Sequence, residues 1–465
     1  MFIKDKSINF LFYTVYIVFW TAIGATPSQL INLNNNKEIA NFFLIYVPLF
    51  ISIFILIPLG LKNIINNIKI TNIFKFHYLF FFLFFFQLIG LIFNTDLNFN
   101  LTNSYLAILG LGFTSIVILA EAREIKIFTY FIYLSMLVLF ILSLIILHSK
   151  IDILLFTSDK YLYSYIIPGE QFVNQSMPRT SGLSRTLAIL VIFFICLLTW
   201  KLKNNFFIIF LLILSLIFGF FIYGLQSRGS ILCYISVFLV LIFFTKKLNF
   251  NFKIFFLLWF LFMPAIMYET FLYFKKNKPE LVLNLREFIK DDNKVLTNNF
   301  TDERLKLINE DSTGNRVFDS KQTTTGRTFL WKEVIKNYDF KKIFGYGPQA
   351  DRFLIKSDQG RWLGNNSSNA MIYSFASGGY FCLLIMLMIY CRGVYLLFIF
   401  IFIKKIFSNS SYTELKISSL FFLFFLIRSI FENSFALFST DFILTITSIT
   451  IIESYYNKKN LIKLS

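Results

Sequence analysis

Arg228 stands alone between two apolar runs, in the stretch YGLQSRGSILCY. No Asp or Glu occurs between Gln171 and Tyr268, so the neighbouring sequence offers this guanidinium no acidic partner. A guanidinium donates to two phosphate oxygens at once and stays charged at any ordinary pH. Arg228 is therefore a candidate for binding an anion such as a phosphate. The alternative is a long side chain that reaches the lipid phosphates at the membrane surface.

Three further arginines lie in polar segments that could meet Arg228. Arg179 and Arg185 occur in MPRTSGLSRTLAIL, and Arg327 occurs in TTGRTFLW. Arg327 falls at the expected start of a helix, where the helix dipole disfavours a cation. A binding role would explain this position, whereas the alternative for each arginine is a solvated surface charge.

Two other stretches carry polar groups beside apolar runs. NNSSNAMIYSFASGGYF, residues 365–381, is either the polar rim of a pocket or a plain helix entry with Ser368 as its N-cap. Asn369 follows directly. In LIRSIFENS, Arg428 and Glu432 are four residues apart, so on a helix they would share a face and pair. Such a pair is either structural or part of a pocket lining.

Cysteine and histidine are too sparse and too scattered for a metal centre. The four cysteines lie in or beside apolar runs without CxxC spacing, and there are only two histidines, His77 and His148. We therefore expect neither a metal nor a cofactor.

The elements that position these residues are membrane helices. Of the 465 residues, 57% are hydrophobic and only 15% are charged, against about 25% in soluble domains. Apolar runs of about 20 residues recur, long enough to cross a hydrocarbon core of about 30 Å, and in lipid such runs form helices. We expect an all-α polytopic membrane protein. Its twelve predicted spans lie near residues 8–24, 40–60, 76–93, 102–120, 127–147, 186–200, 206–225, 230–245, 253–274, 376–403, 416–432 and 439–455.

The distribution of basic residues predicts the orientation. Lys and Arg recur before the first span and in every second connection, whereas the connections 94–101 and 433–440 carry none. This bias predicts that both termini are cytoplasmic and that Arg228 faces the other side. Much of the formal charge of +18 is then a topology signal, so the lipid bilayer is the expected partner and nucleic acid is not.

Three parts follow from this topology. Residues 1–274 form a membrane bundle of nine spans with an outer loop at 148–185, residues 275–370 form a large outer loop, and residues 371–465 form the last three spans. Within the large loop, TTTGRTFLWKEVIKNYDF predicts a helix with Phe329, Leu330, Val334 and Ile335 on its apolar side. FGYGP, which contains Tyr346, predicts a turn.

The ordered set of motifs resembles the bacterial O-antigen polymerase and O-antigen ligase superfamily. QSRGSILCY, GRTFLWKEVIKNYDFKKIFGYGP and SNAMIYSFASGGYF carry the resemblance, and RTSGLSRTLA and RSIFENS are looser matches, so that it covers about residues 175–440. The resemblance implies a GT-C-type architecture and a metal-independent, inverting glycosyltransferase. It also implies an undecaprenyl-diphosphate-linked glycan as donor, a site at the periplasmic face of the bacterial inner membrane, and a chain-length regulator protein as a further partner.

Site residues follow from the matching motifs. The resemblance implies that Arg228 and Arg327 hold the diphosphate and act in catalysis. Substrate-binding roles fall to Arg179, Arg185, Tyr346, Ser368, Asn369, Arg428 and Glu432.

One departure from the family pattern bears on the reaction. Ligases of the superfamily have a histidine directly before the asparagine of the third motif, where it resembles a general base, and this chain has Ser368 there. The departure favours a polymerase over a ligase. Asp351, Glu432 and His148 are alternative bases on the predicted outer side. A flippase for lipid-linked glycans remains a third alternative, although the polar positions lie at the outer boundary rather than at mid-membrane.

Overall fold

The computed structural model describes twelve stretches of the chain. They are residues 5–23, 42–67, 74–94, 104–121, 125–156, 180–201, 204–225, 227–245, 249–277, 327–355, 367–408 and 412–462. Every regular element in these stretches is a helix, and none of them contains a strand. The all-α prediction is therefore confirmed for the described residues.

The helices follow the apolar runs of the sequence. The α-helices are α1 (Asp5–Ile23), α3 (Val47–Ile51), α4 (Ile57–Asn67), α6 (Phe76–Ile92), α8 (Ser104–Glu121), α9 (Ile125–Phe156), α11 (Thr180–Trp200), α12 (Asn205–Gly224), α13 (Arg228–Phe244), α14 (Phe250–Leu257), α15 (Met263–Asn277), α18 (Arg327–Asn337), α19 (Asp351–Leu354), α20 (Ala370–Phe398), α21 (Thr413–Arg428) and α22 (Thr440–Ile462). Wider π-helical turns occupy Phe42–Tyr46, Ser52–Leu56, Leu258–Phe262 and Ile399–Ile403, and a 3-10 turn occupies Ile406–Ser408.

Each predicted span overlaps at least one of these helices. Within the described residues, six helical stretches are long and apolar enough to cross a membrane, namely Val47–Asn66, Lys126–His148, Gly182–Trp200, Asn205–Gly224, Phe250–Phe274 and Ala370–Ile403. Four shorter apolar helices are Phe10–Ile23, Phe76–Ile92, Ser104–Ala120 and Arg228–Phe244. The chain is therefore a membrane protein, while the count of twelve spans and the GT-C-type architecture stay predictions.

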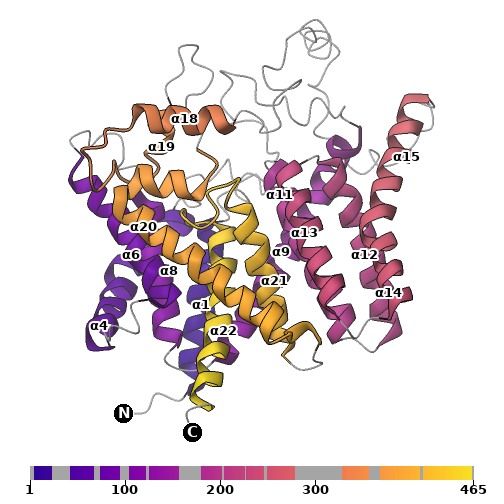
Figure 1. Cartoon of the computed structure of the whole chain (residues 1–465), viewed down its shortest axis with the longest axis horizontal. Coiled ribbons are helices and arrows are strands. Elements are labelled where there is room, and N and C mark those ends of the chain that lie inside the picture. Colours follow the sequence, from indigo (N-terminus) through magenta and orange to yellow (C-terminus); the bar gives the residue numbers. More distant parts are fainter. Residues whose placement is uncertain are drawn as a thin grey trace, which may run out of the picture.

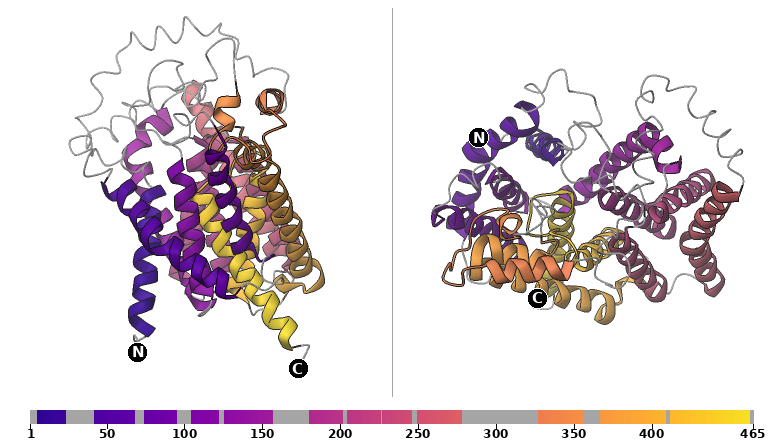
Figure 2. Two further views of the ribbon diagram at one scale, coloured as in Figure 1. Left: turned by 90° about the vertical axis from the view of Figure 1, so that its left-hand side faces the viewer. Right: turned by 90° about the horizontal axis from the view of Figure 1, so that it is seen from above.

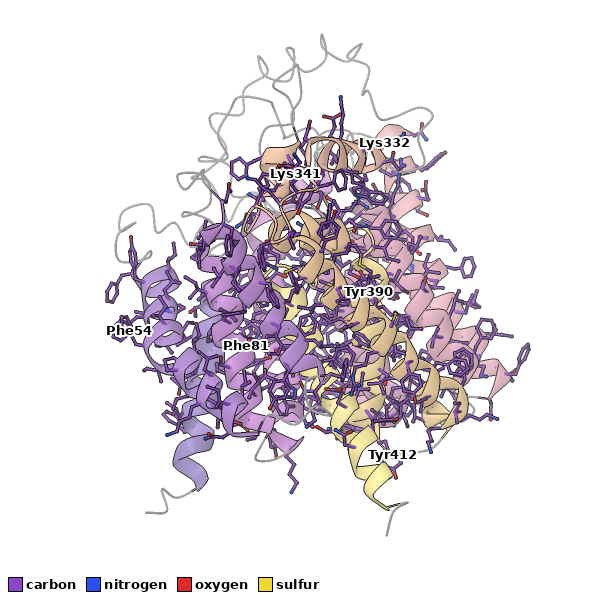
Figure 3. All side chains as sticks on the ribbon, turned by 60° about the vertical axis from the view of Figure 1, so that its left-hand side comes forward. Phe54, Phe81, Lys332, Lys341, Tyr390 and Tyr412 are labelled. Carbon is purple, nitrogen blue, oxygen red and sulfur yellow. The ribbon has the colours of Figure 1, made fainter. Side chains whose placement is uncertain are left out.

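The bundle has two distinct ends. The long helices run roughly side by side, with α18 and α19 across one end and the beginning of α1 and the end of α22 at the other (Figures 1 and 2). This arrangement agrees with a large loop and chain ends on opposite sides. The exposed Lys332 and Lys341 lie at the α18 end, whereas Phe54 projects from the edge of the bundle and Phe81 is buried (Figure 3).

Four helices that are distant in sequence meet around the candidate site. Helix α13 packs against both α11 and α21, α11 also contacts α21, and α21 packs along α22. This packing brings the second turn of α11 and the first turns of α13 and α22 next to the last turn of α21.

Helix α20 is broken near its start by a glycine pair. Gly378 and Gly379 leave the helical conformation, and Gly379 has φ 63° and ψ −151°, a region that is essentially restricted to glycine. A Cβ at Gly379 would lie 1.9 Å from the carbonyl oxygen of Ile343. That oxygen instead accepts a hydrogen bond of 3.1 Å from the Tyr380 amide. The break thus admits the backbone of the preceding segment.

The FGYGP turn occupies this break. The amide of Tyr346 donates to the carbonyl of Ala376 at 3.0 Å, and the amide of Gly347 donates to that of Ser377 at 2.9 Å. The carbonyl of Tyr346 accepts from the Asn94 side chain at 2.8 Å. The predicted turn is confirmed, and it joins α20 to the end of α6.

Helix α18 (Arg327–Asn337) lies within the helix that the sequence predicts, and it covers α19 and α20. Leu330 and Val334 are buried against residues of these helices. Ile335 is 46% exposed, so its predicted place on the apolar side is wrong. Tyr338 packs with Leu330 and Val334 instead, because the three residues are spaced four apart along one helical face. The side chain of Phe329 lies outside the described residues.

Candidate active site

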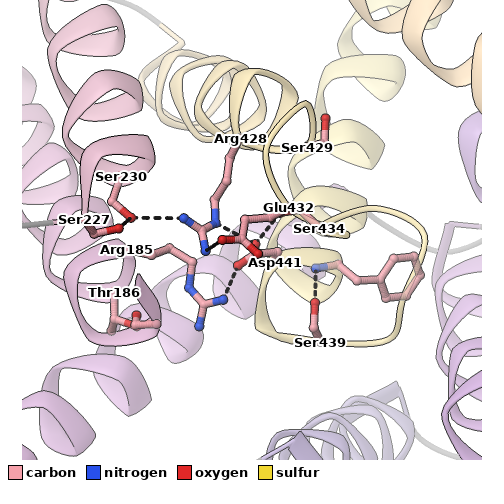
Figure 4. A network of polar contacts seen from close by, with 12 residues as sticks. Arg185, Thr186, Ser227, Ser230, Arg428, Ser429, Glu432, Ser434, Ser439 and Asp441 are labelled. Atoms are coloured by element: carbon pink, nitrogen blue, oxygen red, sulfur yellow. Dashed lines mark hydrogen bonds and ion pairs between the residues drawn. The ribbon is translucent and has the colours of Figure 1, made fainter. Parts of the chain in front are cut away.

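Asp441 connects two arginines from different helices. Its Oδ1 lies 2.7 Å from Nη1 of Arg185 on α11, and its Oδ2 lies 3.0 Å from Nε of Arg428 on α21 (Figure 4). The Ser434 hydroxyl donates to the same Oδ2 at 2.5 Å. The side chains of Asp441 and Arg428 are only 3% and 5% exposed. Each charge is therefore compensated within the protein, as burial requires.

The helix ends favour this arrangement. Arg428 is the last residue of α21, and Asp441 lies in the first turn of α22. A cation at a helix C-terminus and an anion at a helix N-terminus are both stabilised by the backbone dipoles. The predicted pair of Arg428 with Glu432 is also present, with 3.8 Å between Nη2 and Oε1. The reason given for it is wrong, because the helix has ended before Glu432.

The QSRGS motif supplies the start of α13 to this network. Arg428 Nη1 donates to the hydroxyl of Ser230 at 3.0 Å, and the hydroxyl of Ser227 donates to Ser230 at 3.1 Å. Arg228 is the first residue of α13 and is exposed, without an ion pair among the residues that the structure describes. Its side chain is therefore exposed at the end of α13 that supplies Ser227 and Ser230 to the network.

Arg327 approaches from the loop side. Its Nη2 lies 3.5 Å from Oε1 of Glu432, and its guanidinium lies 5.8 Å from the ring centre of Phe431. Its Nη1 is 3.9 Å from the position of a Cβ added at Gly229. The start of α18 thus meets the start of α13. We call Arg185, Arg228, Arg327 and Arg428 the arginine cluster.

The third motif joins the turn that carries Glu432. Asn369 is the N-cap of α20, with its side-chain oxygen accepting from the Ile372 amide at 3.0 Å. The Asn369 side chain also donates to the carbonyl of Ile430, and its amide donates to Asn433 Oδ1, both at 3.0 Å. Ser368 has φ 48° and precedes the cap, so its predicted N-cap role is wrong by one residue.

The remaining predicted residues divide into three groups. Tyr346 contacts Asn94, Asp339 and Ala376 rather than the arginine cluster. Arg179 lies outside the described residues. Asp351, which is buried, accepts a 2.6 Å hydrogen bond from the Ser367 amide and is not a member of the cluster.

Sequence reasoning missed Asp441. The only available signal was its place as the one charged residue between Thr440 and Ile452, in the first turn of an otherwise uncharged run. Charged residues inside membrane segments are rare and usually paired or functional. Its two partners lie far away in sequence, so their identity could not be read from spacing.

The site has more positive than negative charges, which favours the binding of an anion. Three guanidinium groups, those of Arg185, Arg327 and Arg428, pair with the carboxylates of Glu432 and Asp441. The exposed Arg228 at the start of α13 adds a fourth positive charge. Arg228 occupies the first position of α13, where the helix dipole also favours a negative ligand. The arrangement can therefore bind a group with about two negative charges.

Comparison with known proteins agrees with the motifs. Residues 213–387 match a family model described as O-antigen ligase, a segment that contains Arg228, Arg327, Ser368 and Asn369. Searches of curated proteins and of solved structures find no match to the chain. Over this segment, the match confirms the resemblance to the O-antigen ligase/polymerase superfamily.

Proposed function

We propose that this membrane protein is a glycosyltransferase that polymerises oligosaccharide repeats carried on undecaprenyl diphosphate. The reaction takes place at the periplasmic face of the inner membrane, inverts the anomeric centre and uses no metal. The observation that carries the proposal is the arginine cluster with its excess of positive charge, inside a chain whose family model is described as O-antigen ligase.

The proposed chemistry depends on the leaving group. A diphosphate diester carries one negative charge on each phosphate, and this pair of charges matches the excess of the cluster. Arg228 and Arg327, whose side chains are the more exposed, bind the phosphate oxygens. Arg185 and Arg428 are kept in place by their ion pairs with Asp441. Fixed guanidinium groups stabilise the negative charge that develops as the sugar–diphosphate bond breaks.

Alignment of the acceptor makes a second contribution to the acceleration of the reaction. Holding a sugar hydroxyl close to the anomeric carbon converts a bimolecular step into an effectively unimolecular one. Ser368 and Asn369, which sit beside the turn containing Glu432, are the polar groups proposed to line the acceptor side. Because Ser368 replaces the histidine of ligases, the proposal favours polymerisation.

A ligase is the second candidate, and the description of the family model favours it. In that case the acceptor is a lipid core or a protein rather than another repeat. The donor and the arginine cluster have the same roles in both candidates, so the acceptor alone distinguishes them.

A product assay tests the proposal. The purified protein in nanodiscs receives undecaprenyl-diphosphate repeats from its host, and the glycans are separated on a gel. A ladder spaced by one repeat, unaffected by EDTA, is the expected result. Transfer only after addition of a lipid-core acceptor would make the protein a ligase. No transfer with either acceptor, or an EDTA-sensitive activity restored by a divalent metal, would contradict the proposal.

A further inference from the structure

Two carboxylates lie among the arginines, and they are held very differently. Asp441 is 3% exposed and binds its partners at 2.5–3.0 Å. Glu432 is 22% exposed, and its Oε1 lies 3.5 Å from Arg327 and 3.8 Å from Arg428. Charge-assisted hydrogen bonds are normally about 2.7–2.9 Å. Asp441 is therefore a fixed counter-charge, whereas Glu432 is only loosely engaged and reachable from outside.

We propose that Glu432 is the general base that takes the proton of the acceptor hydroxyl, an assignment that rests on the proposed function. While the site is empty, the guanidinium groups of Arg327 and Arg428 form ion pairs with the Glu432 carboxylate. When the donor binds, its diphosphate engages Arg327, and the carboxylate is released next to the acceptor. The Glu432 carboxylate is thus open to the acceptor hydroxyl only when the donor is bound.

The partners of Glu432 differ in their freedom to move. Arg428 is almost buried and is also held by Asp441 at 3.0 Å and by Ser230 at 3.0 Å, so it stays in place. Arg327 is 24% exposed and comes from the first turn of α18, on the loop side. Arg327 is therefore the partner that the donor draws away from Glu432.

The backbone around Glu432 is fixed, which a base requires. The Asn369 side chain donates to the carbonyl of Ile430, and the Asn369 amide donates to Asn433, each at 3.0 Å. The Phe431 amide also donates to the carbonyl of Arg428 at 2.8 Å. The turn is thus held on both sides of Glu432, while its carboxylate keeps some freedom.

The other candidate bases have no comparable geometry. The Asp351 side chain is fully buried and accepts the Ser367 amide at 2.6 Å. His148 is exposed at the end of the Lys126–His148 stretch and contacts no member of the arginine cluster within the described residues. Among the three, only Glu432 lies within ion-pair distance of the arginines.

The proposed step balances without a further reagent. The acceptor oxygen forms a bond to the anomeric carbon of the donor sugar, and the bond from that carbon to the diphosphate oxygen breaks. The electron pair of the broken bond leaves with the diphosphate. The proton of the acceptor hydroxyl passes to the Glu432 carboxylate and then to water.

The test separates donor binding from turnover in nanodiscs. Glu432→Gln is expected to bind the undecaprenyl-diphosphate repeat as tightly as wild type, and to lose at least about 100-fold in turnover, the usual contribution of a general base. Glu432→Ala should be equally slow and should regain activity with added formate, a small carboxylate that replaces the missing group. Rescue by formate requires a folded protein. Glu333→Gln on α18, a carboxylate that contacts Asn337 instead, is the matched control and should keep full turnover.

The outcomes distinguish the two proposals. Turnover of Glu432→Gln at the wild-type rate would overturn the role of Glu432 alone. Loss of donor binding in Glu432→Gln, with no rescue of Glu432→Ala by formate, would also overturn it and leave Glu432 a structural residue. Absence of transfer by the wild-type protein with any acceptor would instead overturn the proposed function.

Discussion

Asp441 binds Arg428 through Oδ2 at 3.0 Å and so ties the last residue of α21 to the first turn of α22. The other oxygen of the same carboxylate holds Arg185 of α11. Two guanidinium groups that would repel each other are thereby kept side by side. The relationship explains how a membrane protein maintains several positive charges at one place before any substrate arrives.

Removal of the Asp441 charge is the first prediction. Asp441→Asn leaves Arg185 and Arg428 without their common counter-charge, and breaking a buried ion pair costs about 3–5 kcal/mol. We expect a clearly lower unfolding temperature in detergent and loss of transfer. Ser434→Ala, which removes one hydrogen bond to the same carboxylate, should cost only about 1.5–3 kcal/mol. An unfolding temperature of Asp441→Asn equal to that of wild type would contradict the structural role.

The second prediction concerns the break in α20. Gly379→Ala places a Cβ 1.9 Å from the Ile343 carbonyl oxygen and forces a non-glycine residue into φ 63°. Backbone strain of this kind costs about 1–3 kcal/mol before any steric shift is counted. The variant should unfold at a lower temperature than wild type. Gly182→Ala on α11 is the matched control, because nothing lies within 4 Å of its added Cβ, and it should be as stable as wild type. Equal stability of both variants would show that the break does not depend on glycine.

The third prediction is a pH dependence at Asp351. Burial raises the pKa of this carboxyl above its ordinary value of 3.8, and the hydrogen bonds from Ser367 oppose that shift only in part. The folded state therefore binds the proton more tightly than the unfolded state. The contribution of protonated Asp351 to the free energy of unfolding is fully present below pH 3.8. It is lost as the pH rises through the folded-state pKa.

Asp351→Asn isolates this effect. The amide oxygen can still accept from the Ser367 amide, but it does not titrate. We expect the variant to match wild type in strong acid and to become relatively more stable as the pH rises, measured as unfolding temperature at a series of pH values. A wild-type protein that gains stability over the variant with rising pH would contradict the raised pKa.

The sequence predicted much of the fold because helices in lipid follow apolar runs. Each predicted span overlaps a helix, and α18 lies within the helix predicted for the large loop. Helix ends were less predictable, since they depend on tertiary contacts. Asn369 rather than Ser368 caps α20 because Asn369 is also fixed by Ile430 and Asn433, which are distant in sequence.

The candidate site was predicted only in part, because its remaining contacts depend on the tertiary structure. The residue types were visible in the sequence, and the predicted topology placed Arg185, Arg228 and Arg327 on one side of the membrane. The counter-charge on Asp441 and the place of Tyr346 in the break of α20 depend on which helices are neighbours. Spacing along the chain does not contain that information.

The rate of glycan transfer by Arg228→Ala and Arg327→Ala tests the central role of the cluster most directly. Both variants should insert and fold like wild type, because neither guanidinium is buried. Each should lose about 100- to 1000-fold in rate, the usual effect of removing one donor to a developing negative charge. Arg→Lys should recover little, since the two-pronged geometry is lost. Lys332→Ala, an exposed cation on α18, is the control and should transfer normally. Wild-type rates in both arginine variants would contradict the binding of the diphosphate by this cluster.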